Sequence, residues 1–347
     1  MDFVAIGEEL GTETTSAILG LIVGLVFGIF AQQSRFCLRA ACVEFWRGHP
    51  GVKFSIWLLS FSAALLATQY LIFTDNLDTS AVRQLANTGS LSGAIIGGLL
   101  FGIGMVLARG CASRLLVLSG TGNLRALVSG LIVTVAAQAS LRGALSPLRE
   151  KLGALWLVDA ESRNMANYLP EIAGMLAGAI LLVLALYFVY KNKTGVWVSF
   201  GAVVVGASVA LGWFLTNWHA SWSFDTVAVQ SVSFTGPAAD TLMGLINTPK
   251  IELSFSVGLV PGVFFGSMLA ALLTREFEVQ KFTEETGLTR YLIGAVIMGF
   301  GGMLAGGCAV GAGVTGGAVL AVTAWVALFF MWLGAGLTDL LIDKPKS

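Results

Sequence analysis

Two segments of this 347-residue chain share one glycine-rich pattern that ends in a cysteine. Residues 102–112 read GIGMVLARGCA and residues 299–309 read GFGGMLAGGCA, and their glycine, leucine, alanine and cysteine positions agree at a constant offset. The repeat places two of only four cysteines, Cys111 and Cys308, at equivalent positions. Both lie in apolar surroundings, where a thiol is the only reactive group. The repeat therefore predicts that related segments bring paired sulfur contacts into an apolar core.

The composition places that core in a membrane. Hydrophobic residues make up 56% of the chain and charged residues only 12%, whereas soluble domains carry roughly 25% charged residues. The 43 glycines allow membrane helices to approach closely and allow backbone to line a cavity. A formal net charge of zero gives no electrostatic footprint for nucleic acid.

The hydropathy pattern predicts an all-α polytopic membrane protein that forms one transmembrane domain over 1–347. A full crossing takes about 20 residues. Nine apolar runs approach or exceed that length: 17–33, 55–74, 91–108, 124–141, 171–190, 196–215, 255–273, 291–305 and 318–341. We expect about nine transmembrane helices plus short re-entrant half-helices. The runs that end at Cys111 and Cys308 are short and interrupted by glycine, which in paired halves points to a transporter's binding site.

A second, weaker repeat relates GLVFGIF at 24–30 to GLVPGVF at 258–264. Together the repeats predict an internal pseudo-two-fold relation between units of approximately 17–141 and 255–341, joined by helices 171–215. Nine alternating crossings would make the two cysteine-bearing runs antiparallel but the first and seventh runs parallel. One inverted repeat cannot contain both arrangements, so we expect at least one segment to be re-entrant.

Basic residues are distributed unevenly among the loops, and such residues favour the cytoplasmic side. Lys and Arg are frequent in 34–53, 191–195, 274–290 and the C-terminal tail, and scarce in 75–90 and 216–250. The bias predicts a periplasmic N-terminus and a cytoplasmic C-terminus, which needs an odd number of crossings.

The cysteines are the first candidates for a functional site. A free cysteine is usually a small buried hydrophobe, but the duplication favours a functional role for Cys111 and Cys308. Cys37 stands between Arg35 and Arg39, in an electropositive setting at the end of the first apolar run. Cys42 has no counterpart in the repeat, and we interpret it as a packing residue.

Residues beside the repeated cysteines are the next candidates. Gly110 and Gly307 directly precede them, and unwound backbone at membrane depth is tolerated only where it lines a cavity or is buried in protein. Arg109 and Arg114 flank Cys111, and arginine within a membrane segment is a functional candidate by default. Thiols, arginine and helix ends together suit an anion with a soft sulfur, such as thiosulfate.

Three segments of the chain resemble signatures of the YeeE/YedE family of thiosulfate transporters. They are FCLRAA at 36–41, GMVLARGCASRLLVLSGTGNLRALV at 104–128 and GMLAGGCAVGAGVTGG at 302–317. The resemblance implies an hourglass-shaped protein of the bacterial inner membrane with a central constriction lined by Cys37, Cys111 and Cys308. It implies passage of thiosulfate by S–H···S contacts with these thiols, for sulfur assimilation. It also implies a possible cytoplasmic partner, a small TusA-like sulfur-carrier protein.

Other functions stay open from the residues alone. A permease for another soft sulfur or selenium compound would use the same thiols. A Cu(I) permease could use Met105 and Met303 with the repeated cysteines, although nearby arginines disfavour a cation. A membrane thiol oxidoreductase would need a cysteine pair close enough to oxidise, and the chain contains no CxxC. We expect a transporter rather than an enzyme, with no metal or other cofactor.

Overall fold

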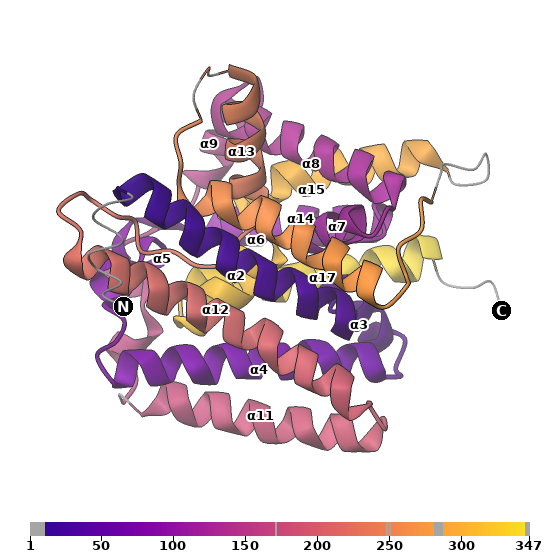
Figure 1. Ribbon diagram of the computed structural model, residues 1–347, viewed down its shortest axis with the longest axis horizontal. Helices are drawn as coiled ribbons and strands as arrows, with labels where there is room; N and C mark the ends of the chain where they lie inside the picture. The colour runs from indigo at the N-terminus through magenta and orange to yellow at the C-terminus, as the bar shows by residue number, and fades with distance from the viewer. Residues whose placement is uncertain (1–10, 171, 248, 250, 281–286, 344–347) are drawn as a thin grey trace.

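The computed structural model describes residues 11–343 except 171, 248, 250 and 281–286. The described chain is almost entirely helical (Figure 1). One two-stranded antiparallel sheet pairs β1 (Gly89–Ser90) with β2 (Leu157–Val158). The helices are α2 (Thr12–Ser34), α3 (Leu38–Trp46), α4 (Val52–Phe73), η1 (Thr79–Ala81), α5 (Arg83–Ala86), α6 (Leu91–Leu107), α7 (Ala112–Gly120), α8 (Leu124–Arg142), α9 (Ser146–Gly153), α10 (Ala160–Arg163), η2 (Met165–Tyr168), α11 (Ala173–Lys191), α12 (Val196–Trp222), α13 (Thr235–Asn247), α14 (Phe255–Leu273), α15 (Leu288–Leu304), η4 (Ala309–Thr315), α16 (Gly316–Ala318), α17 (Val322–Thr338) and η5 (Asp339–Asp343).

Within the described residues, nine helical segments are long and apolar enough to cross a bilayer. This confirms the prediction of an all-α polytopic membrane protein with about nine spans. The long helices lie roughly side by side, and α2 begins at the opposite end of the bundle from the last turns after α17 (Figure 1). The described part of the chain therefore starts and ends on opposite faces, as an odd number of crossings requires.

Helices α2 and α14 pack in parallel through glycines spaced four residues apart. On α2 these are Gly20, Gly24 and Gly28, and on α14 they are Gly258, Gly262 and Gly266. A Cβ atom at Gly24 would collide with the carbonyl of Leu259, and one at Gly262 would meet the carbonyl of Leu21. Small residues thus let the two backbones touch, which is the main way helices associate inside a membrane.

Helices α6 and α15, which precede the repeated cysteines, pack in the antiparallel sense. A Cβ on Gly97 would lie 2.6 Å from the carbonyl oxygen of Gly301, and one on Gly104 would lie 2.6 Å from that of Gly294. Parallel and antiparallel pairs therefore coexist in the fold. A two-fold axis in the membrane plane can relate the antiparallel helices α6 and α15, but it cannot relate the parallel helices α2 and α14 to each other. The repeat units of approximately 17–141 and 255–341 stay a prediction.

Helix α11 presents an exposed apolar surface of the kind that faces a bilayer. Its side chains Ile180, Val183 and Tyr190 are 67%, 68% and 86% exposed, although the helix has no charge before its final turn. Leaving this surface in water would be costly. The exposure is that of a lipid-facing helix.

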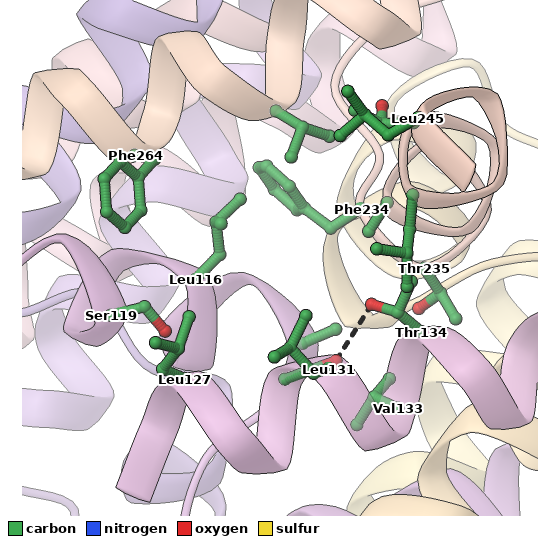
Figure 2. A pocket seen from close by; sticks show the side chains of 16 residues that line it. Leu116, Ser119, Leu127, Leu131, Val133, Thr134, Phe234, Thr235, Leu245 and Phe264 are labelled. Carbon is green, nitrogen blue, oxygen red and sulfur yellow. Dashed lines mark hydrogen bonds between the residues drawn. The ribbon is translucent and has the colours of Figure 1, made fainter. Parts of the chain in front are cut away.

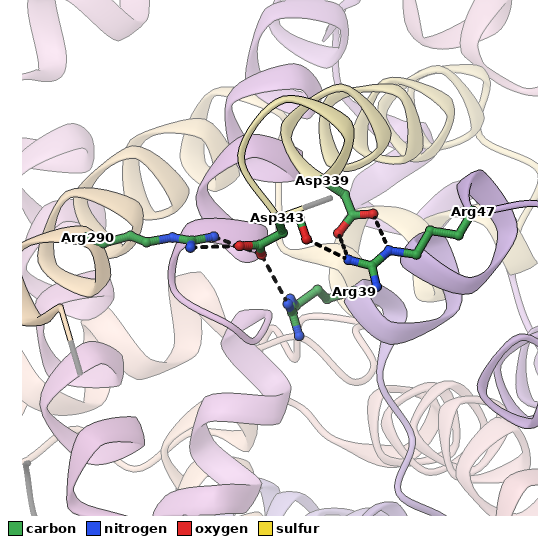
Figure 3. A network of polar contacts seen from close by, with 5 residues as sticks. All are labelled: Arg39, Arg47, Arg290, Asp339 and Asp343. Carbon is green, nitrogen blue, oxygen red and sulfur yellow. Dashed lines mark hydrogen bonds and ion pairs between the residues drawn. The ribbon is translucent and has the colours of Figure 1, made fainter. Parts of the chain in front are cut away.

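An ionic network ties the last helical turns to the rest of the bundle (Figure 3). Arg47 donates two hydrogen bonds to Asp339, at 2.8 and 2.9 Å, and the Asp339 side chain is fully buried. These bonds raise the pKa of the Arg47 guanidinium above its usual value. Arg290 binds Asp343 with both terminal nitrogens, and Arg39 lies 3.6 Å from the same carboxylate. The network joins α3, α15 and η5 at one end of the molecule.

The glycine contacts predict a sharp difference between two Gly→Ala variants. Gly102 packs on the backbone of Met331 and Ala335, so a methyl group there forces the helices apart. Such overpacking costs about 1–3 kcal/mol. Gly195 has open space and an ordinary negative φ, so Gly195→Ala is the matched control. Thermal melting in detergent should show a lower midpoint for Gly102→Ala only, and equal midpoints would refute the packing account.

Candidate functional site

Three broken helices carry a cysteine at the same structural position. In each case a long apolar helix ends, and the cysteine then starts a short helix as its N-terminal flanking residue. The cysteines are Cys37 before α3, Cys111 before α7 and Cys308 before η4. The repeat predicted this equivalence for two of the cysteines, and the structure adds Cys37 as a third.

The backbone of each break follows one hydrogen-bonding scheme. The residue two positions before the cysteine has a left-handed conformation, and its N–H and that of the next residue donate back into the preceding helix, as in a Schellman motif. The left-handed residues are Arg35 (φ 57°), Arg109 (φ 56°) and Gly306 (φ 85°). Before Cys37, the N–H groups of Arg35 and Phe36 donate to the carbonyls of Gln32 and Ala31. Before Cys111, those of Arg109 and Gly110 donate to Val106 and Met105, and before Cys308, those of Gly306 and Gly307 donate to Met303 and Gly302, all at 2.8–3.4 Å. Helix carbonyls that a break would leave unpaired are thereby satisfied.

The thiols gather in the interior. Cys111 and Cys308 are each 1% exposed and Cys42 is fully buried, whereas Cys37 is partly exposed. The Cys111 sulfur lies within electrostatic range of the sulfurs of Cys37 and Cys308, so the three predicted site cysteines share one region of the interior, called the cysteine cluster below. Cys42, predicted to be a packing residue, lies in range of Cys37 and Cys111. All four cysteines are free.

The two repeated thiols make different local contacts. The Cys111 sulfur lies 3.3 Å from the hydroxyl of Ser113, and the Cys308 sulfur accepts a hydrogen bond from the N–H of Gly311 at 3.3 Å. Cys308 thus uses its side chain to cap the helical turn that follows it. The sulfur is the acceptor in this contact, so the contact does not use the S–H group of Cys308.

The two predicted site glycines, Gly110 and Gly307, are required by the structure for different reasons. Gly307 has φ 157°, and a Cβ there would lie 2.8 Å from the N atom of Ala312. Gly110 is buried, and a Cβ there would press against Leu115 at 3.3 Å. Both positions keep the backbone beside the thiols free of side chains.

The two predicted site arginines do not lie together. Arg109 is exposed, and its guanidinium lies over the ring of Tyr291 at 5.9 Å. Arg114 is partly buried, close enough to Cys37 and Cys111 for their charges to interact. Lys53 lies in the same electrostatic neighbourhood as Arg114 and Cys37. The positive charge near the thiols therefore includes Arg114, Lys53 and Arg35, whereas Arg109 lies against Tyr291.

Two residues near Arg114, Gln32 and Glu276, were not identified as candidates from the sequence. Gln32 is 2% exposed, and its amide joins Arg114 to Glu276. Glu276 also forms an ion pair with Arg35 at 2.5 Å. Residues 244 positions apart meet here, so only their polarity within or beside apolar runs could have drawn attention to them.

A separate apolar cavity of about 210 Å³ lies among α7, α8, α13 and α14 (Figure 2). The hydroxyls of Ser119, Thr134 and Thr241 on its wall each donate to a carbonyl of their own helix. Aliphatic and phenyl side chains form the rest of the lining apart from Thr235. The cavity offers an anion no compensation for losing its water, so the cysteine cluster is the better candidate site.

The fold and the site define a multi-pass membrane protein of transporter type, since broken helices that meet inside a bundle are how such proteins build binding sites. A model of the sulphur transport family matches residues 33–337, and the chain belongs to that family. The predicted resemblance to YeeE/YedE proteins is thereby confirmed.

Two curated relatives are similar over nearly their full lengths. The thiosulfate transporter TsuA of Escherichia coli strain K12 is 28% identical over 349 residues, covering 93% of this chain and 94% of the relative. The thiosulfate transporter TsuA of Spirochaeta thermophila is 27% identical over 332 residues, covering 91% and 96%.

The burial of the thiols predicts their order of chemical labelling. A water-soluble maleimide should modify Cys37 at least about tenfold faster than Cys42, Cys111 or Cys308, because thiol reactivity follows exposure. Mass spectrometry of protein labelled in mild detergent measures the rates. Labelling after SDS unfolding is the control and should reach all four cysteines. Rapid native labelling of Cys308 would contradict the packing described here.

Proposed function

We propose that this protein takes up thiosulfate across the bacterial inner membrane for sulfur assimilation. In this proposal the ion passes a constriction lined by Cys37, Cys111 and Cys308, and S–H···S contacts hand its terminal sulfur from one thiol to the next. The observation that carries the proposal is the cluster of three thiols, each at the start of a half-helix after a broken span. Family membership and the names of the two relatives support the substrate.

The physical chemistry of the cluster suits this substrate. A thiol is polarizable and a weak hydrogen-bond donor, so it contacts a sulfur atom favourably but weakly. Weak contacts of this kind do not require the anion to be held tightly. Several weak sites in sequence let an ion enter and leave. The half-helices α3 and α7 present the positive ends of their dipoles beside Cys37 and Cys111, which favours an anion over a cation.

The neighbouring residues have supporting roles in the proposal. Gly110 and Gly307 keep side chains away from the path, and Arg114 attracts the oxygens of the ion. Arg109, whose side chain is exposed, adds positive potential at the surface of the protein rather than a direct contact. No bond of the substrate is broken, so the protein acts as a transporter and not as an enzyme.

The orientation and the partner also belong to the proposal. The N-terminus lies in the periplasm and the C-terminus in the cytoplasm, supported by the basic loops at the end where α17 finishes. Cys37, the partly exposed thiol, then lies towards the cytoplasmic side, close to the electropositive residues Arg35 and Lys53. In this proposal a TusA-like carrier docks on this side of the protein.

The relay predicts a graded response to cysteine replacement. Cys111→Ala and Cys308→Ala should abolish uptake, because each removes a contact that nothing else in the constriction supplies. Cys37→Ala should impair uptake strongly, by about tenfold or more on the scale of a lost binding contact. The measurement is growth on thiosulfate as sole sulfur source in a bacterium that lacks its own sulfate and thiosulfate uptake.

Cys42→Ala is the matched control, since it removes a buried thiol that starts no half-helix, and it should grow nearly as wild type. Cys→Ser variants separate size from chemistry, because serine keeps the volume but loses the soft contact. Normal growth of Cys308→Ala would refute the relay. Growth that requires selenium compounds, or uptake that follows copper instead of thiosulfate, would favour the alternative permeases.

A further inference from the structure

The Gln32 amide forms a bridge between a positive and a negative side chain. Arg114 Nη1 donates to Gln32 Oε1 at 3.4 Å, and Gln32 Nε2 donates to Glu276 Oε2 at 3.2 Å. A guanidinium can only donate and an ionised carboxylate can only accept. The chemistry therefore fixes the orientation of the amide, and rotating it would break both contacts.

Glu276 is already occupied without Arg114. One of its oxygens pairs with Arg35 at 2.5 Å and the other accepts the bond from Gln32. Arg114 lies within electrostatic range of Glu276. Among the described residues, however, no carboxylate lies within ion-pair distance of the Arg114 guanidinium. Gln32 stands between the two charges and takes the place of a direct pair.

This arrangement leaves most of the Arg114 donors available. A guanidinium carries five N–H groups, and among the described residues only the bond to Gln32 uses one of them. The same guanidinium lies in electrostatic range of Cys37 and Cys111. Arginine with free donors is well matched to an oxyanion, which it can bind through two parallel hydrogen bonds.

We propose that Gln32 is a positioning residue that holds Arg114 beside the thiols and away from Glu276. Arg114 then binds the oxygens of a small sulfur oxyanion while a thiol of Cys37 or Cys111 contacts its terminal sulfur. This inference rests on the proposed function and adds to it the group that recognises the oxygen end of the substrate. Without Gln32, Arg114 pairs with Glu276 and its donors are lost to the substrate.

A rescue experiment tests the role of Gln32. Initial rates of radiolabelled thiosulfate uptake into proteoliposomes give KM and Vmax for Gln32→Leu, Glu276→Gln and the double variant. Gln32→Leu should raise KM about tenfold with little change in Vmax, as expected when a binding contact is lost. The double variant should recover most of that loss, because Arg114 then has no carboxylate to pair with. A double variant as impaired as Gln32→Leu would overturn the proposal.

Two further variants keep the test decisive. Gln32→Glu is nearly isosteric and offers Arg114 a carboxylate at once, so its KM should rise at least as much, and an unchanged KM would overturn the inference. Gln33→Leu is the matched control, since Gln33 contacts the Trp197 carbonyl instead, and its KM should equal that of wild type. Failure of the wild type to transport thiosulfate would refute the proposed function itself, whereas normal wild-type uptake with unchanged KM in both Gln32 variants refutes only this inference.

Discussion

Backbone hydrogen bonding in an apolar medium is the constraint on which this structure depends. A helix that stops inside a membrane leaves N–H and C=O groups without water, and each unpaired group is costly. The three cysteine-bearing breaks use a turn that also ends α4, α11 and α14. In this turn the N–H of a left-handed residue and the N–H of the next residue donate back to the helix that has ended. In each of these three breaks the last residue before the next helix is extended, and that residue is a cysteine.

The close approach of helices follows from the same constraint. A break can be buried only if neighbouring backbone shields it, and glycine allows that approach. Gly28, Gly102 and Gly299 each stand nine residues before a cysteine, and each packs on the backbone of another long helix. The close packing at these glycines thus helps to bury the three half-helix starts and their thiols in one region of the bundle.

Local sequence signals revealed most of the fold and part of the site. The nine spans and the breaks before Cys111 and Cys308 follow from hydropathy and from the glycine repeat. The equivalent break before Cys37 was not predicted, because Phe36 precedes this cysteine where a glycine precedes Cys111 and Cys308, so the sequence lacks the repeated Gly-Cys pattern. The link from Gln32 to Arg114 spans 82 residues and depends on how α2 packs beside α7, so no local pattern encodes it. The placement of Arg109 over Tyr291 likewise depends on tertiary packing, so no local pattern predicted it.

The most direct test of the account is a structure of the protein with thiosulfate bound, determined at a resolution that distinguishes sulfur from oxygen. The account predicts density for the ion among Cys37, Cys111 and Cys308, with its terminal sulfur in contact with a thiol. Thiosulfate bound elsewhere, or with only its oxygens facing the thiols, would contradict the claim that these cysteines carry the ion.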